Sequence, residues 1–264
     1  MADTGSQFNF DRVRASYSKE KTLMIVVKRL TKQYGKFTAV NDVSFTVKRG
    51  EVFAFLGPNG SGKTTMLKSI VGLNIPTSGS IHVNGIDVRT HSKEAKQFIS
   101  YLPQRVIFPE TMTAREVVRF YSSLRNISKS LADEALSNAG FNGFSDKPVH
   151  EFSGGMIQRL GMTVIAIPDS PILLLDEPTA NLDPQGVKQF RDFIMEQKAK
   201  GKTIIFSTHL LAEAEQLADR VAIFVSGKLA ALESIDNLRT TFLKEGTIED
   251  LYLHYVGNSH HEEH

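Results

Sequence analysis

The stretch Gly57-Pro58-Asn59-Gly60-Ser61-Gly62-Lys63-Thr64-Thr65 decides the fold of this 264-residue chain. It fits the pattern Gly-x-x-x-x-Gly-Lys-Ser/Thr of a phosphate-binding loop, or P-loop. Its glycines let successive backbone N–H groups turn inward, and no Cβ keeps a polyphosphate away. Lys63 supplies a positive charge for the β- and γ-phosphates, and the Thr64 hydroxyl suits Mg²⁺. The stretch therefore predicts a nucleotide site.

The flanking residues support this interpretation. The apolar run Glu51–Leu56 predicts a buried strand before the loop, and Thr64–Val71 predicts a helix after it. Such a helix points its positive end at the bound anion. The alternative is an ordinary glycine-rich turn between strand and helix. A plain turn has no need of the Lys63-Thr64 pair, so we favour the P-loop.

Composition limits the class of protein. Hydrophobic residues make up 41% of the chain and charged residues 23%, as in ordinary globular domains. A net charge of +2 gives no argument for nucleic acid, and the lack of cysteine excludes disulfides and thiolate metal sites. No window approaches 18 uninterrupted apolar residues, so we expect any membrane role to come through a partner.

Alternating patterns predict an α/β domain. Residues 1–21 show no periodicity, and we expect a flexible extension there. The expected strands are 22–27, 43–47, 51–56, 80–83, 99–102, 171–175, 203–207, 220–224 and 228–232, with turns at Asn84-Gly85 and Ser226-Gly227. Between them the middle of the chain predicts three helices, beginning near Thr113, Ser130 and Ser153. The pattern indicates a mainly parallel sheet, an antiparallel section and a helical insertion.

Two further segments follow buried strands. Asp176 and Glu177 come directly after the apolar run Ile172–Leu175, and His209 follows the strand at 203–207. Ligands of open α/β sheets bind at the carboxyl ends of the strands, so these groups are expected to meet the P-loop. An acidic pair that caps a loop, or a histidine at a helix start, is the structural alternative for each.

In this setting the chain resembles the ATP-binding cassette (ABC) ATPases over about residues 23–256. Phe152-Ser153-Gly154-Gly155-Met156 resembles the family signature, although Phe152 and Met156 depart from the usual leucine and glutamine. The other matching segments are Tyr101–Gln104 (glutamine loop), Thr179–Asp183 (D-loop), Ser207–His209 (switch histidine) and Tyr34, where the family stacks an aromatic ring on adenine. A half-buried tyrosine at a strand end is the alternative for Tyr34.

The resemblance implies an α/β fold, namely a P-loop NTPase cassette with a mainly parallel core sheet, an antiparallel β subdomain and a helical subdomain. It implies an ATPase domain at 22–240, with helical residues at about 105–165, and a C-terminal helix and His-rich tail at 241–264. It also implies ATP and Mg²⁺ as cofactors and a head-to-tail homodimer. Each ATP would then lie between the P-loop of one chain and the signature of the other.

Residue roles follow from the same resemblance. The catalytic candidates are Glu177 as general base, with His209, Lys63 and Gln104. The Mg²⁺ candidates are Thr64, Gln104 and Asp176. The nucleotide-binding candidates are Tyr34, Gly57, Pro58, Asn59, Gly60, Ser61, Gly62, Lys63, Thr64, Thr65, Ser153, Gly154, Gly155 and Asp183. Ser153 is also a good helix N-cap, and both functions are compatible.

The signature and the following Gln158-Arg159 look like the exporter branch that serves six-helix membrane subunits. We expect an ATPase that drives an integral membrane permease, located in the cytoplasm and peripheral on the inner face of the cell membrane. Val106–Phe120 is also similar to ATPases that support copper-site maturation of nitrous oxide reductase. The alternative is a soluble ABC-type ATPase in cofactor assembly or another role outside transport, or a nucleotide-binding regulator that does not hydrolyse.

The end of the chain carries His260, His261 and His264 beside two glutamates. Histidine and carboxylate can bind a transition metal. A solvated terminus or part of an expression tag is the interpretation that we favour.

Overall fold

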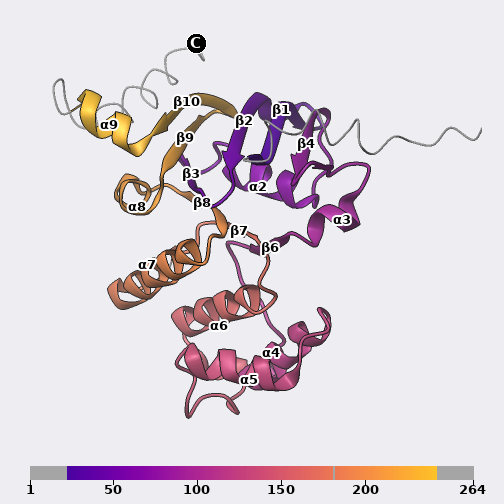
Figure 1. The fold of residues 1–264 in the computed structure, drawn as a ribbon, viewed down its shortest axis with the longest axis vertical. Coiled ribbons are helices and arrows are strands. Elements are labelled where there is room, and N and C mark those ends of the chain that lie inside the picture. Colours follow the sequence, from indigo (N-terminus) through magenta and orange to yellow (C-terminus); the bar gives the residue numbers. More distant parts are fainter. Residues whose placement is uncertain (1–22, 181, 243–264) are drawn as a thin grey trace, which may run out of the picture.

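The computed structural model describes residues 23–180 and 182–242. The extension expected at 1–21 and most of the expected C-terminal helix and tail lie outside these residues. Helix α9 (Ile235–Phe242) is described, and it runs across the boundary expected at residue 240. Figure 1 shows two sheets together in one half of the molecule and three helices, α4, α5 and α6, grouped at the opposite end.

A six-stranded sheet forms the core, in the order β10-β9-β3-β8-β7-β6. Five of its strands run parallel and β10 pairs antiparallel with β9, as the sequence predicted. The strands are β3 (Val52–Leu56), β6 (Ile99–Leu102), β7 (Ile172–Leu175), β8 (Thr203–Thr208), β9 (Arg220–Val225) and β10 (Lys228–Ser234). The central strands β3, β7 and β8 are buried along their whole length, which explains their continuous apolar runs.

Alternate residues of β3 face two separate apolar clusters. Phe53 and Phe55 pack with residues of α2 (Lys63–Val71) and of the antiparallel sheet. Val52, Ala54 and Leu56 pack with residues of α7 (Pro184–Ala199) and α8 (Leu211–Leu217). The core sheet is thus covered on both faces, and in such sheets ligands bind at the loops that follow the carboxyl ends of the strands.

A second, antiparallel sheet has the order β2-β1-β4-β5, from strands Phe37–Lys48, Leu23–Tyr34, Ser78–Val83 and Ile86–Asp87. The sequence predicted only parts of β1 and β2. Their pairing shifts register at several points, and Arg29 and Asp42 have φ values of 47° and 49°. These irregularities interrupt the alternation of apolar and polar residues that a strand prediction needs.

Both predicted two-residue turns are confirmed. Asn84 and Gly85 join β4 to β5 with φ values of 49° and 79°, and Ser226 and Gly227 join β9 to β10 with values of 46° and 77°. Two consecutive positive φ values are what a type I′ hairpin turn requires. The short helices α3 (Ser92–Lys96) and η1 (Val149–Glu151) and helix α9 were not predicted.

Helices α4 (Ala114–Ser123), α5 (Lys129–Asn138) and α6 (Gly154–Ala166) pack around their own apolar cluster. The predicted capping box at Thr113 and Glu116 is present at the start of α4. Phe141 is fully buried in the cluster, and the Arg159 guanidinium lies 4.8 Å from its ring centre. These helices therefore form a compact unit, which we call the helical subdomain.

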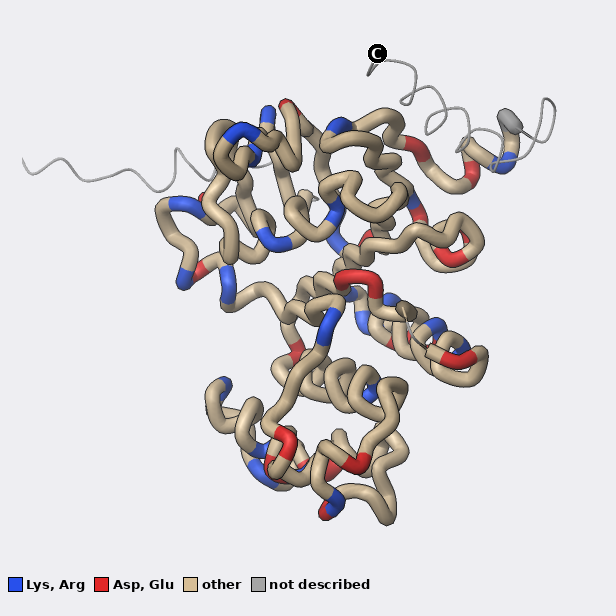
Figure 2. Tube along the Cα trace, turned by 180° about the vertical axis from the view of Figure 1, so that it is seen from behind, with Lys and Arg blue, Asp and Glu red and all other residues tan. Residues whose placement is uncertain are grey.

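Charged side chains are paired locally. Figure 2 shows Lys and Arg interspersed with Asp and Glu over the part of the chain that it colours. In the helical subdomain, Arg115 forms a bidentate ion pair with Asp146, in which Nε and one terminal nitrogen each donate to a carboxylate oxygen. Arg119 forms the same bidentate pair with Asp133. The hydrogen bonds from Arg119 hold the pKa of Asp133 below its usual value. These bidentate pairs connect α4 to α5 and to the loop after α5.

We predict that Phe141→Ala loosens the helical subdomain. Removing a fully buried phenyl ring typically lowers the free energy of unfolding by about 3–5 kcal/mol, because the cavity collapses only in part. Phe144 is 40% exposed and serves as the matched control, with an expected change below about 1 kcal/mol. Urea unfolding of both variants measures the difference, and equal losses would contradict the assignment of Phe141 to the core.

Candidate active site

The P-loop joins the end of β3 to the start of α2, as predicted. Gly62 lies just before the helix with φ of 104°, and a Cβ there would come within 2.5 Å of the Ala39 carbonyl oxygen. A Cβ on Gly57 would come within 2.2 Å of the Phe224 carbonyl oxygen. Neighbouring backbone therefore excludes any side chain at both positions.

Lys63 lies inside the loop and is only 4% exposed. Its Nζ donates hydrogen bonds to the carbonyl oxygens of Gly57 at 2.7 Å and Pro58 at 3.0 Å. It also lies 3.5 Å from Glu177 Oε1. Burial lowers the pKa of Lys63, and the nearby carboxylates of Glu177 and Asp176 oppose this shift. The loop thus holds a buried lysine between its own carbonyl oxygens and the carboxylate of Glu177.

Asp176 follows β7 and is 1% exposed. Its Oδ1 accepts hydrogen bonds from Thr64 Oγ1 at 2.9 Å and from Ser207 Oγ at 2.8 Å. The Tyr101 hydroxyl lies 3.3 Å from its Oδ2, and burial together with the Asp176 charge raises the pKa of Tyr101. Three hydroxyl groups from three different elements therefore surround one buried carboxylate.

Glu177 lies beside Asp176 and contacts three of the predicted residues. Besides Lys63, its carboxylate accepts a hydrogen bond at 3.0 Å from Gln104 Nε2, and His209 Nδ1 lies 3.8 Å from Oε2. Its backbone is left-handed, with φ of 43°, which is uncommon for a residue with a side chain. A buried carboxylate between a lysine and a histidine can orient a water molecule and accept its proton.

The residues fit the predicted Mg²⁺ site in part. Mg²⁺ takes one or two carboxylates, hydroxyl groups, phosphate oxygens and water, and the Thr64 and Asp176 oxygens lie side by side here. Gln104 contacts Glu177 through its amide nitrogen rather than this oxygen pair. Over residues 23–180 and 182–242 there is no group of three or more His, Cys, Asp or Glu that could hold a metal alone.

The signature residues lie apart from the P-loop. Ser153 is the N-cap of α6 and accepts a hydrogen bond from Met156 N, so the predicted capping role is confirmed. Asp183 caps α7 in the same way, with Gly186 N at 2.7 Å. In the described part of the chain no hydrogen bond or ion pair joins Ser153, Gly154 or Gly155 to the P-loop. The exposed Ser153 and Gly154 leave the start of α6 open to solvent.

Tyr34 is the last residue of β1 and is 47% exposed. Its hydroxyl accepts a hydrogen bond from Asn74 Nδ2 at 2.8 Å, and Lys32 Nζ lies 4.8 Å from the ring centre. Both contacts fix the ring while leaving much of its surface free. Its place at the end of β1 is the one expected from the structural alternative, and its exposed ring is also compatible with stacking on adenine.

Sequence reasoning missed two contacts of this site. Tyr101 and Ser207 lie in segments that the sequence singled out, but neither was given a role. Their position in the sheet could have revealed them. Both lie at or near the carboxyl end of a strand next to β7, where a hydroxyl group can reach Asp176.

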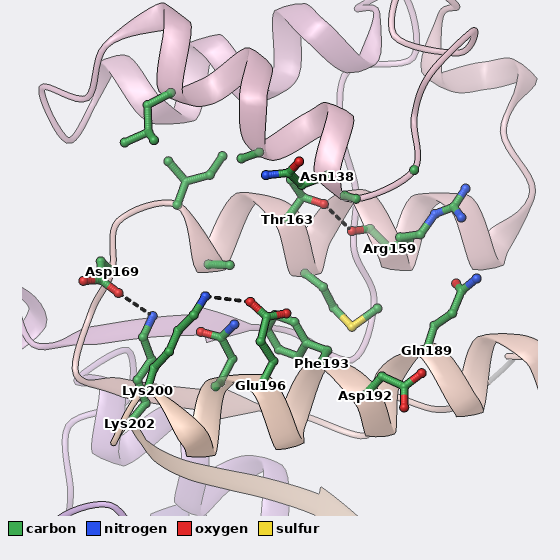
Figure 3. A pocket seen from close by; sticks show the side chains of 18 residues that line it. Asn138, Arg159, Thr163, Asp169, Gln189, Asp192, Phe193, Glu196, Lys200 and Lys202 are labelled. Atoms are coloured by element: carbon green, nitrogen blue, oxygen red, sulfur yellow. Dashed lines mark hydrogen bonds and ion pairs between the residues drawn. The ribbon is translucent and has the colours of Figure 1, made fainter.

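A cavity of about 740 Å³ lies elsewhere, between α5, α6 and α7. Figure 3 shows Arg159 and Thr163 on one wall and Glu196 and Lys200 on the other. Glu196 and Lys200 are paired at 2.6 Å, and Asp169 and Lys202 at 2.9 Å. No predicted site residue lines this cavity, so it is separate from the P-loop.

The fold and the site define a P-loop nucleotide hydrolase with a helical insertion. The sequence profile of the ABC transporter family matches residues 40–180, and the chain belongs to this family. It is 35% identical to the lantibiotic transport ATP-binding protein SrtF of Streptococcus pyogenes over 213 residues, covering 81% of this chain and 92% of SrtF. It is 36% identical to the probable multidrug ABC transporter ATP-binding protein YbhF of Escherichia coli, covering 82% of this chain and 38% of YbhF.

Solved structures agree with the fold. An ATP-binding subunit of an ABC transporter superposes with a TM-score of 0.80 at 30% identity, covering 88% of this chain and 99% of that one. The dimeric, post-hydrolysis cassette MJ0796 with ADP and phosphate gives a TM-score of 0.72 at 26% identity, covering 80% and 99%. The chain is therefore an ABC ATPase that binds ATP, and the predicted fold class is confirmed.

We predict that Gly62→Ala weakens ATP binding at least tenfold, because the new Cβ must displace the Ala39 carbonyl or shift the P-loop. Gly201→Ala is the matched control. Gly201 also has a positive φ, of 75°, but an added Cβ there would have no atom within 4 Å. Gly201 is also far from the P-loop in the sequence. Fluorescent-nucleotide titration compares the two variants. Equal affinities for ATP would show that the close approach at Gly62 has no bearing on binding.

Proposed function

We propose that this chain is the ATP-hydrolysing subunit of an ABC exporter, in which two copies close head to tail on two ATP molecules and drive an integral membrane permease. One observation carries the proposal. Six candidate residues meet within one chain, namely Lys63, Thr64, Gln104, Asp176, Glu177 and His209. Ser153 and Gly154 of the signature are instead exposed to solvent, and no hydrogen bond or ion pair of the described residues joins them to the P-loop. A second copy would supply the missing half of the nucleotide site.

Each residue has a role that its contacts support. Glu177 is the general base: its carboxylate would take the proton of the attacking water, and Gln104 and His209 hold it in place. Lys63 would exchange its bonds to the Gly57 and Pro58 carbonyls for phosphate oxygens and balance the charge that develops on them. Tyr34 offers its exposed ring for stacking on adenine.

Thr64, Gln104 and Asp176 are proposed to hold Mg²⁺ and its water molecules. The ion would neutralise phosphate charge during transfer. Thr64 and Asp176 supply adjacent oxygens, and Gln104 comes from the loop after β6. Phosphoryl transfer depends on such positioning and electrostatics more than on covalent chemistry.

The proposed homodimer draws support from the signature segment and from a relative. Ser153 and Gly154 are exposed at the N-terminus of a 13-residue helix, where backbone N–H groups suit a γ-phosphate. The MJ0796 cassette, which superposes on this chain, was solved as a dimer. Asp183, at the N-cap of α7, would lie near the interface as part of the D-loop.

A permease partner is proposed from the surface and from the named relatives. The helical subdomain and the loop before it expose Ile107, Phe120 and Leu124 at 68%, 50% and 64%. The structure has no helix, in the residues it describes, that could cross a membrane. The lantibiotic and multidrug functions in the names of SrtF and YbhF favour export. The ATPase would then lie in the cytoplasm, on the inner face of the membrane.

Co-purification tests this part of the proposal. The ATPase should be recovered from detergent-solubilised membranes together with an integral protein, and Phe120→Asp should release it while leaving ATP binding intact. Recovery of the wild-type chain in the soluble fraction alone would favour the alternative, a soluble ATPase in cofactor assembly.

A finer proposal concerns cargo. The resemblance of Val106–Phe120 to ATPases of copper-site maturation suggests that the transporter supports nitrous oxide reductase. This segment runs from the loop after Gln104 into α4, on the surface proposed to meet the permease. Loss of the gene should then leave the reductase without its copper signature, and normal copper content would exclude this cargo.

We predict that Glu177→Gln lowers ATP turnover by roughly 10²–10⁴, because the amide cannot accept the proton of the attacking water. Glu51→Gln is the matched control: Glu51 is also buried, but it lies just before β3, at the end opposite the P-loop. Turnover is measured by phosphate release. Wild-type turnover in Glu177→Gln would reject its assignment as the base.

We predict that Glu177→Gln forms a stable dimer with MgATP and that adding Ser153→Glu abolishes this dimer, since a carboxylate at the start of α6 repels the γ-phosphate. Ser128→Glu is the matched control, because Ser128 caps α5 in the same way. Size-exclusion chromatography separates the two species. A dimer that survives Ser153→Glu would contradict the head-to-tail arrangement.

A further inference from the structure

Ser207 makes two contacts that no predicted role accounts for. It lies near the end of β8, is fully buried, and pairs with Phe55 of β3 in the parallel ladder. Its Oγ donates a hydrogen bond to Asp176 Oδ1 at 2.8 Å and accepts one from the Glu177 backbone N–H at 2.9 Å. One hydroxyl group therefore links the carboxylate of one residue to the backbone of the next.

The second contact matters because of the backbone at Glu177. With φ of 43°, this residue departs from the extended conformation two residues after the end of β7. Asp176 N still bonds to the Leu102 carbonyl of β6 at 2.9 Å, but Glu177 N turns to the Ser207 side chain. A buried N–H without a partner is costly, so the serine hydroxyl stabilises this left-handed turn.

The first contact matters because of Thr64. Thr64 Oγ1 and Ser207 Oγ both donate to the same oxygen of Asp176. If Thr64 turns to Mg²⁺, as proposed above, Ser207 keeps its bond to Oδ1, and Tyr101 keeps its contact with Oδ2 at 3.3 Å. Ser207 is thus placed to fix the orientation of the carboxylate after the nucleotide and metal have entered.

We propose that Ser207 is a positioning residue that holds the carboxylate of Asp176 and the backbone of Glu177 in a fixed relation. The inference rests on the proposed roles of these two residues in metal binding and proton transfer. In this proposal Ser207 acts through Asp176 and Glu177 and not on the metal or the substrate directly. Its loss should weaken the metal site and misplace the base together, because both depend on one hydroxyl group.

The test compares Ser207→Ala, which removes the hydroxyl, with Ser207→Cys, which keeps the side-chain shape but bonds weakly. Ser100→Ala is the matched control. Ser100 is a buried serine on β6 of the same sheet, but its hydroxyl bonds to Ser170 Oγ at 3.0 Å and not to a carboxylate. The Cys variant keeps the proposal testable if the Ala variant fails to fold.

Two measurements are made on the full-length protein. In the nucleotide-free protein, the backbone amide of Glu177 should exchange its hydrogen faster in both Ser207 variants. Its exchange rate should be unchanged in Ser100→Ala. Mn²⁺ binding, followed by electron paramagnetic resonance with a non-hydrolysable ATP analogue, should weaken by roughly 10–100-fold in Ser207→Ala, the usual effect of losing a partner of a metal ligand. Ser207→Cys should fall between the wild-type protein and Ser207→Ala.

Unchanged exchange of the Glu177 amide together with unchanged Mn²⁺ affinity in the Ser207 variants would overturn the proposal. An equal loss of Mn²⁺ affinity in Ser100→Ala would overturn it as well. Asp176→Asn separates this failure from failure of the proposed function. If Asp176→Asn binds Mn²⁺ as tightly as the wild-type protein, the metal assignment is wrong, and the positioning role then stands or falls on the exchange of the Glu177 amide alone.

Discussion

The hydrogen bond from Thr64 to Asp176 joins the start of α2 to the loop after β7, and the two residues are 112 positions apart in the sequence. It is possible because β3, β8 and β7 are neighbours in a parallel sheet, so that their carboxyl ends meet at one edge. The full burial of these strands fixes their register, since a slip of one residue would move each apolar set to the other face. The active-site geometry therefore depends on the packing of the two clusters around this sheet.

The ends of these strands carry a network of buried polar groups. Asp176, Glu177 and Lys63 are each less than a tenth exposed, and isolated charges at that depth would be costly. They are tolerated because each has partners: hydroxyl groups for Asp176, and an amide, a lysine and a histidine for Glu177. Local strain at Glu177 belongs to the same network, as its amide is satisfied by a side chain and not by the sheet.

The helical subdomain is connected to this network by Gln158. This buried residue of α6 donates a hydrogen bond at 2.9 Å to the Pro178 carbonyl, directly after the proposed base. The helix that begins with the signature residues is thus bonded to the loop that carries Glu177. In the proposed dimer, each chain would bind one ATP with its P-loop and Glu177 and the other ATP with its signature residues. The Gln158 contact would connect these two parts of the same chain.

Although it gave no role to Tyr101 or Ser207, the sequence by itself predicted the fold class and most members of the candidate site, from the glycine loop, the acidic pair after a buried strand and the order of the segments. It did so because turns, caps and buried strands are set by residues close together in the chain. It could not give the full length of β1 and β2, because bulges break their alternation.

Only the tertiary structure decided which side chains meet. Gln104 contacts Glu177 and not the Thr64–Asp176 pair, and Ser207 bridges Asp176 to Glu177. Such contacts depend on strand register and on side-chain directions across the sheet. Local sequence patterns do not encode these, because they arise from the packing of strands that are far apart in the chain.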